Sequence, residues 1–390
     1  MITGTTIGIG ILGLPIKTGL AGVLPSLAAT IAVWVVMLAT GWIIARGIIA
    51  SEEQIDISTL VHRKLGMPGR VMTVAGYLVL VYGIITAHLA GGGDVLSALT
   101  GGRLPANTSI LIFFVVATFI ALLGVRLVEK VNTFLMAGLF VAFCILLFEA
   151  AKSVDVARFA HKDWGFLAST IPIIVCAQTY QLIIPSVCRI LDNDSKSVMK
   201  AMIIGTLIPV AVNALWMVAV VGALPLAGAG ENTILAAFRK GQAATVPLAA
   251  ALQSPVISRF ALIFSMVVLV SSYVLQSTAV IGFFEDLLPK GLGTKRRTAS
   301  IVLGFVPPLA VVFIYPGIFL EALDVIGGGS VILLFGIIPG LMLFRESAPA
   351  MGRTRALAIC LVLVSLFFMG IEVMQEVGLL KISPNMEYWL

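Results

Sequence analysis

Long apolar runs recur from one end of the 390-residue chain to the other. A helix needs about 20 mostly apolar residues to cross the hydrocarbon core of a bilayer. Only 11% of the residues are charged, against about 25% in soluble domains. The sequence therefore predicts an all-α polytopic membrane protein that forms a single integral domain over residues 1–390. We place eleven spans at about 2–20, 24–46, 70–98, 108–125, 130–150, 166–188, 198–224, 256–285, 298–315, 319–344 and 354–378.

The basic residues indicate how these spans are oriented. If the N-terminus is cytoplasmic, most of the 25 Lys and Arg residues fall in inner loops, as the positive-inside rule requires. We therefore predict a cytoplasmic N-terminus and a C-terminus outside. Because topology accounts for the basic excess, no nucleic-acid partner is indicated. The inner connection 47–69 is either a short amphipathic helix or a solvated connector, and residues 225–255 are expected to form short surface helices outside.

The composition of the first span disfavours an uninterrupted helix. Four glycines and a proline fall between Thr3 and Pro15, and both residue types disfavour a helix interior. Backbone groups left unpaired in hydrocarbon are costly unless protein or a water-filled cavity surrounds them. We expect a broken helix that lines a site. The alternative is that the glycines serve only close helix packing.

The sixth span carries a similar interruption. Pro172 and Pro185 flank a polar run from Gln178 to Gln181. Five spans separate the starts of the two segments, so a duplicated five-span unit would be inverted, and inverted repeats place a substrate near the bilayer midplane. The predicted repeats are about 1–150 and 166–344, with an extra helix at about 354–378. The alternative is a proline-kinked helix whose polar groups bond to neighbouring helices.

Several motifs together resemble a known family, the hydroxy/aromatic amino-acid permeases of the tryptophan/tyrosine permease type, within the amino-acid/polyamine/organocation superfamily. The resemblance covers nearly the whole chain. Its motifs are Gly4 to Pro15, Thr18 to Gly22, Leu24-Pro25-Ser26, Ala90-Gly91-Gly92-Gly93, Ile184-Pro185-Ser186 and Tyr315-Pro316-Gly317-Ile318-Phe319.

The resemblance implies a leucine-transporter-like fold, a 5+5 inverted repeat with broken helices 1 and 6, in a proton-coupled importer of the bacterial inner membrane. Two departures stand out. The family's charged cytoplasmic tail does not precede the first span, so we expect the native protein to start upstream of Met1. The run Gln178 to Gln181 stands where the family has a Ser-Phe-Gly-like sequence, so side-chain specificity is expected to differ.

An amino-acid substrate brings a carboxylate and an ammonium group to the site. Backbone N–H groups at a half-helix N-terminus suit the carboxylate, and unwound carbonyls suit the ammonium. Spans three and eight are expected to contact the substrate side chain, with Tyr82 of span three as a pocket wall and Ser272 of span eight as a further substrate-binding candidate. The candidate main-chain site consists of Thr5, Thr6, Gly8, Ile9 and Gly10 from span one and Gln178, Thr179 and Tyr180 from span six.

Four residues are candidates for ion or proton coupling. Ser271 and Ser272 lie mid-span and, in related folds, hydroxyls at this place complete a sodium site; bonding to their own helix is the alternative. His88 titrates near neutral pH, although a lone buried histidine is more often structural. Asp324 is the deepest acidic residue, an outer-gate or proton group or half of a structural ion pair, with Lys17 or Arg259 as its partner.

The remaining titratable residues indicate no chemistry of their own. Most of the acids Asp94, Glu149, Glu321, Glu372 and Glu376 are expected near the outer interface, where a side chain reaches water cheaply, and no special role is expected for them. The four cysteines show no metal-ligand spacing and are interpreted as buried thiols. No P-loop, nucleophile-and-base pair, metal site or cofactor motif is present in the sequence, so an enzyme is disfavoured.

The sequence therefore predicts a secondary active transporter that imports an aromatic or large neutral amino acid by proton symport through alternating access. A sodium-coupled symporter or an exchanger of the same fold is the alternative. A channel or a membrane substrate sensor is the alternative from a different class. The expected partners are a small-molecule amino acid, a proton or sodium ion, and membrane lipids.

Overall fold

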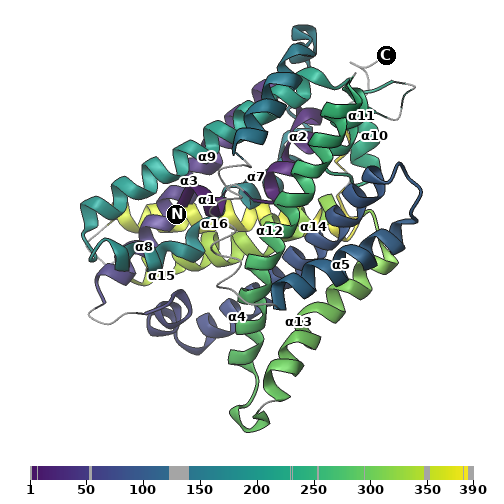
Figure 1. The fold of residues 1–390 in the computed structure, drawn as a ribbon. Helices are drawn as coiled ribbons and strands as arrows, with labels where there is room; N and C mark the ends of the chain where they lie inside the picture. The colour runs from purple at the N-terminus through teal and green to yellow at the C-terminus, as the bar shows by residue number, and fades with distance from the viewer. Residues whose placement is uncertain are drawn as a thin grey trace.

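The computed structural model describes residues 2–6, 8–51, 55–122, 140–228, 230, 232–252, 254–293, 295–346, 352–380 and 382–384, and their regular structure is entirely helical. Eight helical segments in this part of the chain are long and apolar enough to cross a membrane, and two shorter apolar helices accompany them. The predicted class, an all-helical polytopic membrane protein, is confirmed. Figure 1 shows the N-terminal end of the chain in the middle of the molecule, surrounded by the later helices.

The first predicted span is broken. It consists of α1 (Ile2–Thr6) and α2 (Gly10–Ala21), and the helix is interrupted at Gly8 and Ile9. A sharp turn at Gly22, with φ of 91°, leads into α3 (Val23–Ile49). Glycine is required at this turn because a Cβ there would overlap the carbonyl of His161.

The sixth predicted span is broken as well. It contains η2 (Phe166–Thr170), α7 (Ile171–Ala177), η3 (Gln181–Ile183) and α8 (Ile184–Ile190). Pro172 and Pro185 each lie in the first turn of a half-helix. The missing N–H of proline costs nothing there, because the first N–H groups of a helix have no intrahelical partner. The prolines therefore start the two half-helices, and the non-helical segment is Gln178 to Tyr180.

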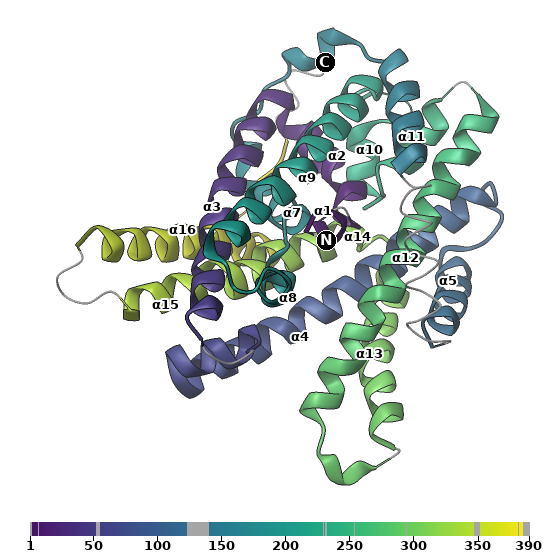
Figure 2. The ribbon, with the colours of Figure 1, turned by 60° about the vertical axis from the view of Figure 1, so that its left-hand side comes forward.

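Two helices are longer than a bilayer requires, as predicted. Helix α4 (Ile57–Leu99) has 43 residues and bends at Gly66, and α12 (Pro255–Leu287) has 33. Of the two alternatives for residues 47–69, the structure has the short helix, which is the part of α4 before Gly66. Helix α4 packs against α5 (Ala106–Leu122), α12 and α13 (Lys295–Ile314). Figure 2 shows α12 and α13 as a hairpin at one side of the molecule.

A long helix and a short one pack against the broken first span. Helix α9 (Ser195–Ala223) runs beside α1 and α2, and its first turn is capped by Asp194, which accepts from the Ser197 N–H. Short helices within residues 225–255 are present as α10 (Ile234–Arg239) and α11 (Thr245–Ala251), but more than half of their residues are buried and do not lie on the surface as expected. Two short 3₁₀ segments, η1 (Val156–Ala160) and η4 (Lys290–Leu292), lie in connections.

The tenth span is irregular and almost wholly buried. It consists of α14 (Phe319–Asp324), the π-helical segments η5 (Val325–Val331) and η6 (Leu333–Ile337), and α15 (Ile338–Glu346). Helix α16 (Gly352–Glu376) folds back against it, and Figure 2 shows α15 and α16 side by side. The backbone of η5 crosses α7 closely, because a Cβ at Gly327 would overlap the carbonyl oxygen of Pro172.

Parts of the prediction lie outside the described residues. The predicted span 108–125 is seen as α5 up to Leu122, and of the span 130–150 the structure describes helix from residue 140 onward. Met1, and with it the expectation of an upstream start, also lies outside.

The three consecutive glycines of the tenth span, Gly327 to Gly329, offer a matched test of the packing of η5 against α7. Gly327→Ala is expected to lower the free energy of unfolding by about 1–3 kcal/mol, because the new methyl group forces η5 away from α7. Gly329→Ala is the control, since a Cβ there meets nothing within 4 Å. Thermal unfolding of both purified variants in detergent checks this. Equal midpoints for the two variants would contradict the close crossing at Gly327.

Candidate functional site

The two interruptions face each other in the interior. A Cβ at Gly10, the first residue of α2, would lie 2.8 Å from Cα of Ala177, the last residue of α7. The N-terminal end of α2 therefore touches the C-terminal end of α7. Because helix N-termini attract negative charge and C-termini attract positive charge, this junction presents both signs within one small volume.

The broken first span contains a carbonyl that proline deprives of its usual partner. In a regular helix the N–H of residue 15 would donate to the carbonyl of Ile11, but Pro15 has no N–H. The indole Nε1–H of Trp216 donates to this carbonyl at 3.0 Å. The neighbouring carbonyl of Leu12 accepts from the N–H of Ala244 at 2.7 Å. Helix α9 and the loop before α11 thus stabilise the start of α2.

Helix α9 also contacts the second interruption. Asn213 lies three residues before Trp216 and therefore on the same face. Its Nδ2 donates to the carbonyl of Ala177 at 3.4 Å, while its Oδ1 is buried without a hydrogen-bond partner among the described residues. One face of α9 thus holds both broken helices. Our sequence prediction missed these two residues, although a polar residue three positions from a tryptophan in mid-span was a usable signal.

The predicted residues of span one lie at or beside the interruption. Gly8 and Ile9 form the break, and their carbonyls accept from the N–H groups of Ile11 and Leu12 at 3.2 and 3.1 Å. The Thr6 hydroxyl donates to the carbonyl of Ile2 in its own helix. Thr5 belongs to α1, but its side chain lies outside the described set.

The polar run of span six is directed largely at α3. The Gln178 amide donates to the carbonyl of Thr30 at 3.0 Å, and the Tyr180 hydroxyl donates to the carbonyl of Met37 at 3.3 Å. Tyr180 is fully buried there, whereas the Thr179 hydroxyl bonds to its own helix at Val175. The alternative interpretation of polar groups bonding to a neighbouring helix thus describes Gln178 and Tyr180. Gln178 Oε1 is buried and has no partner among the described atoms.

Tyr82 and His88 of span three make their contacts within α4 and with α12 and α13. Tyr82 donates to the carbonyl of Leu303 at 3.0 Å and stacks on Phe284, so it faces α12 and α13. The His88 Nδ1 contacts the carbonyl of Ile84 at 2.7 Å, and its ring meets the edge of Tyr273. Ser271 is buried and Ser272 is half-buried on α12. The structure does not bring Tyr82 to the junction of α2 and α7.

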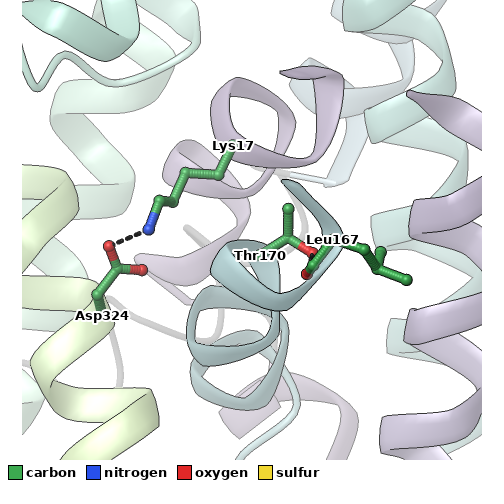
Figure 3. A network of polar contacts seen from close by, with 4 residues as sticks. All are labelled: Lys17, Leu167, Thr170 and Asp324. Carbon is green, nitrogen blue, oxygen red and sulfur yellow. Dashed lines mark hydrogen bonds and ion pairs between the residues drawn. The ribbon is translucent and has the colours of Figure 1, made fainter. Parts of the chain in front are cut away.

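Asp324 forms a buried ion pair with Lys17. Lys17 extends from α2 and Asp324 ends α14, and Figure 3 shows the ammonium group pointing at one carboxylate oxygen. Every residue of α2 is buried, so an unpaired lysine there would be costly. Of the two partners that the sequence offered, the structure selects Lys17. The other oxygen of Asp324, Oδ1, is buried without a partner in the described part of the chain.

Two expectations about polar residues were wrong. Glu372 does not reach water, because it is 4% exposed and packs against Gly328 of η5. Of the four cysteines, Cys188 is buried, but Cys144 and Cys360 are exposed on the surface of their helices. Among the described residues no three His, Cys, Asp or Glu side chains are grouped as metal ligands.

The fold and the junction of two broken helices define an integral membrane protein of the transporter class. Residues 1–375 match the tryptophan/tyrosine permease family. The chain belongs to this family of aromatic amino-acid transporters and is not an enzyme. The resemblance drawn from the sequence motifs is confirmed.

Individual relatives align over most of their length. The tyrosine-specific transport system 2 of Haemophilus influenzae is 27% identical over 342 residues, which cover 84% of this chain and 82% of that protein. The tryptophan-specific transport protein of Pseudomonas aeruginosa is 23% identical over 359 residues, covering 88% and 84%. Glutamine transporter 2 of Aliivibrio fischeri is 21% identical over 231 residues, covering 57% and 60%.

The bond from Trp216 to Ile11 can be tested by a double-mutant cycle. Trp216→Phe is expected to lower the free energy of unfolding by about 1–3 kcal/mol, because it leaves a buried carbonyl unpaired. Pro15→Ala restores an N–H at position 15 that can donate to Ile11, so the same Trp216 substitution should cost less in that background. Thermal unfolding of the four proteins in detergent measures both costs. Equal costs in the two backgrounds would show that the indole does not replace the missing donor.

Proposed function

We propose that the protein imports an aromatic amino acid by proton symport through alternating access in a leucine-transporter-like fold. In this proposal inverted repeats at about 1–150 and 166–344 enclose the substrate, and the helix at about 354–378 lies outside the repeat. The chain would lie in a bacterial inner membrane with its N-terminus in the cytoplasm and its C-terminus outside.

The observation that carries the proposal is the contact of Gly10 with Ala177. It joins the N-terminal end of α2 to the C-terminal end of α7 between two interrupted helices. A substrate carboxylate would bind the first N–H groups of α2, at Ile9 and Gly10, and its ammonium group would bind carbonyls at the ends of α1 and α7, at Thr5, Thr6 and Gln178 to Tyr180. Gly8 and Gly10 would let the substrate approach the backbone closely.

The relatives support the aromatic side chain of the proposed substrate. Two are described as tyrosine- and tryptophan-specific, and a more distant one as a glutamine transporter. Tyr82 and Ser272 stay candidates for residues that set substrate specificity. To reach the substrate, the Tyr82 side chain would have to leave its contacts with Leu303 and Phe284. Coupling to protons is preferred because buried ionisable groups within membrane spans commonly form proton pathways. His88, Ser271 and Asp324 stay candidates for the coupling site.

Reconstituted transport tests this function. Proteoliposomes loaded with unlabelled tyrosine or tryptophan are expected to take up the labelled amino acid by saturable counterflow. In empty vesicles, an inward proton gradient, and not a sodium gradient, should drive accumulation of the labelled amino acid. Accumulation that follows only sodium would establish the sodium-coupled alternative. Counterflow without accumulation under either gradient would indicate an exchanger. Channel currents without counterflow, or binding without transport, would refute the transporter mechanism.

A substitution at the junction tests where the substrate binds. Gly10→Ala places a methyl group against Ala177 and is expected to separate the two half-helices. An overpacking cost of about 1–3 kcal/mol at the site would weaken substrate binding by about 5- to 150-fold. Gly282→Ala on α12 is the matched control, because a Cβ there meets nothing within 4 Å. Binding of labelled tyrosine or tryptophan measures both. Unchanged affinity in Gly10→Ala would place the site elsewhere.

A further inference from the structure

Helix α16 presents a single buried stripe to the tenth span. Residues of this stripe pack directly against glycines of the tenth span. A Cβ at Gly336 would lie 2.5 Å from Oγ of Ser365, and a Cβ at Gly328 would lie 2.6 Å from Cγ of Glu372. The rest of the helix is mostly exposed. The described residues of α16 that are buried are Ala358, Leu361, Ser365 and Glu372. One member of an otherwise apolar or small stripe is therefore an ionisable acid.

The position of Glu372 brings it to the ion pair of Lys17 and Asp324. Gly328 lies four residues after Asp324 and so on nearly the same side of the tenth span. The missing side chain of Gly328 leaves the space that Glu372 fills, and Glu372 is close enough to interact electrostatically with both Asp324 and Lys17. The three groups come from α2, α14 and α16, which are distant in sequence.

The charges in this cluster do not balance. Lys17, Asp324 and Glu372 are each no more than 5% exposed, and one ammonium group faces two carboxyl groups. Asp324 also keeps one buried oxygen, Oδ1, that has no hydrogen-bond partner among the described residues. Two buried carboxylates that share one counter-charge favour the binding of one further positive charge. In the part of the chain that the structure describes, the other titratable groups that interact with the cluster are Glu321 on α14, Glu376 on α16 and Cys176 on α7.

We propose that Asp324 and Glu372, together with Lys17, form the binding site for the transported proton. This inference rests on the proposed proton symport and names its site. A hydronium ion on one side gives its proton to a carboxylate oxygen of the pair, so one O–H bond of hydronium breaks as the carboxyl O–H bond forms and water is left. On the other side the carboxyl O–H bond breaks as a water molecule takes the proton and becomes hydronium.

The place of Lys17 on α2 links this proton to the substrate. The same helix begins at Gly10, in the proposed substrate site, and carries Lys17 two turns further on. When α2 moves relative to α14, Lys17 moves relative to Asp324. With Lys17 withdrawn, the two carboxyl groups hold a proton between them, and with Lys17 returned, its ammonium group replaces that proton. Movement of one half-helix thereby couples the two sites.

Replacing Glu372 by a neutral isostere tests the proposal. A one-proton symporter under a gradient of one pH unit supports about tenfold accumulation of substrate. Glu372→Gln imitates the protonated acid permanently, so it should lose this accumulation of labelled tyrosine or tryptophan while still exchanging them by counterflow. Glu372→Asp keeps a carboxyl group and should restore part of the accumulation. Thermal unfolding in detergent verifies that each variant is folded.

Glu376→Gln is the matched control, one turn further along α16 on an exposed position. It should accumulate substrate as the unmodified protein does. Accumulation by Glu372→Gln at the unmodified level, or an equal loss in Glu376→Gln, would overturn the assignment to Glu372. Absence of counterflow in the unmodified protein would instead refute the proposed function, and accumulation driven by sodium alone would overturn the proton as the bound ion.

Discussion

Every backbone polar group within a bilayer has to find a partner inside the protein, and the centre of this structure depends on that requirement. Pro15 removes the donor that the carbonyl of Ile11 would have had in a regular helix, and Trp216 supplies another at 3.0 Å. Asn213, on the same face of α9, reaches the carbonyl of Ala177 at the end of α7. A single intact helix therefore holds two broken ones, and the breaks persist because their polar groups are bonded by neighbours.

Close backbone approach is the second requirement, and glycine meets it at a few positions. Gly10 lets α2 touch α7, and Gly327 lets the π-helical part of the tenth span cross α7. Gly328 has a different consequence, because the space that it leaves is filled by a carboxyl group of α16. Two contacts thus join α7 to α2 and to η5, while the third brings an acid beside the ion pair of Lys17 and Asp324.

Most of the fold could be predicted because a bilayer admits few kinds of spanning structure. Length, hydropathy, glycine and proline located the spans, both interruptions, and the two over-long helices α4 and α12. The candidate site could be predicted only in part. Gly8, Ile9 and Gly10 were identified correctly as part of an interruption, since glycine affects the backbone directly. Tyr180 and Gln178 were selected for their polarity alone, and polarity does not reveal that both side chains bond to α3.

The chain's own sequence determined its membrane class, its family motifs and the two places where the helix breaks, because these follow from local composition and backbone chemistry. Only the tertiary structure decided which partners those breaks acquire. Trp216 and Ile11 are 205 positions apart, and Lys17 and Asp324 are 307 apart. Glu372 had the sequence context of an acid near a helix end, and packing against Gly328 buried it instead. Contacts over such separations depend on how whole helices pack, which no local pattern specifies.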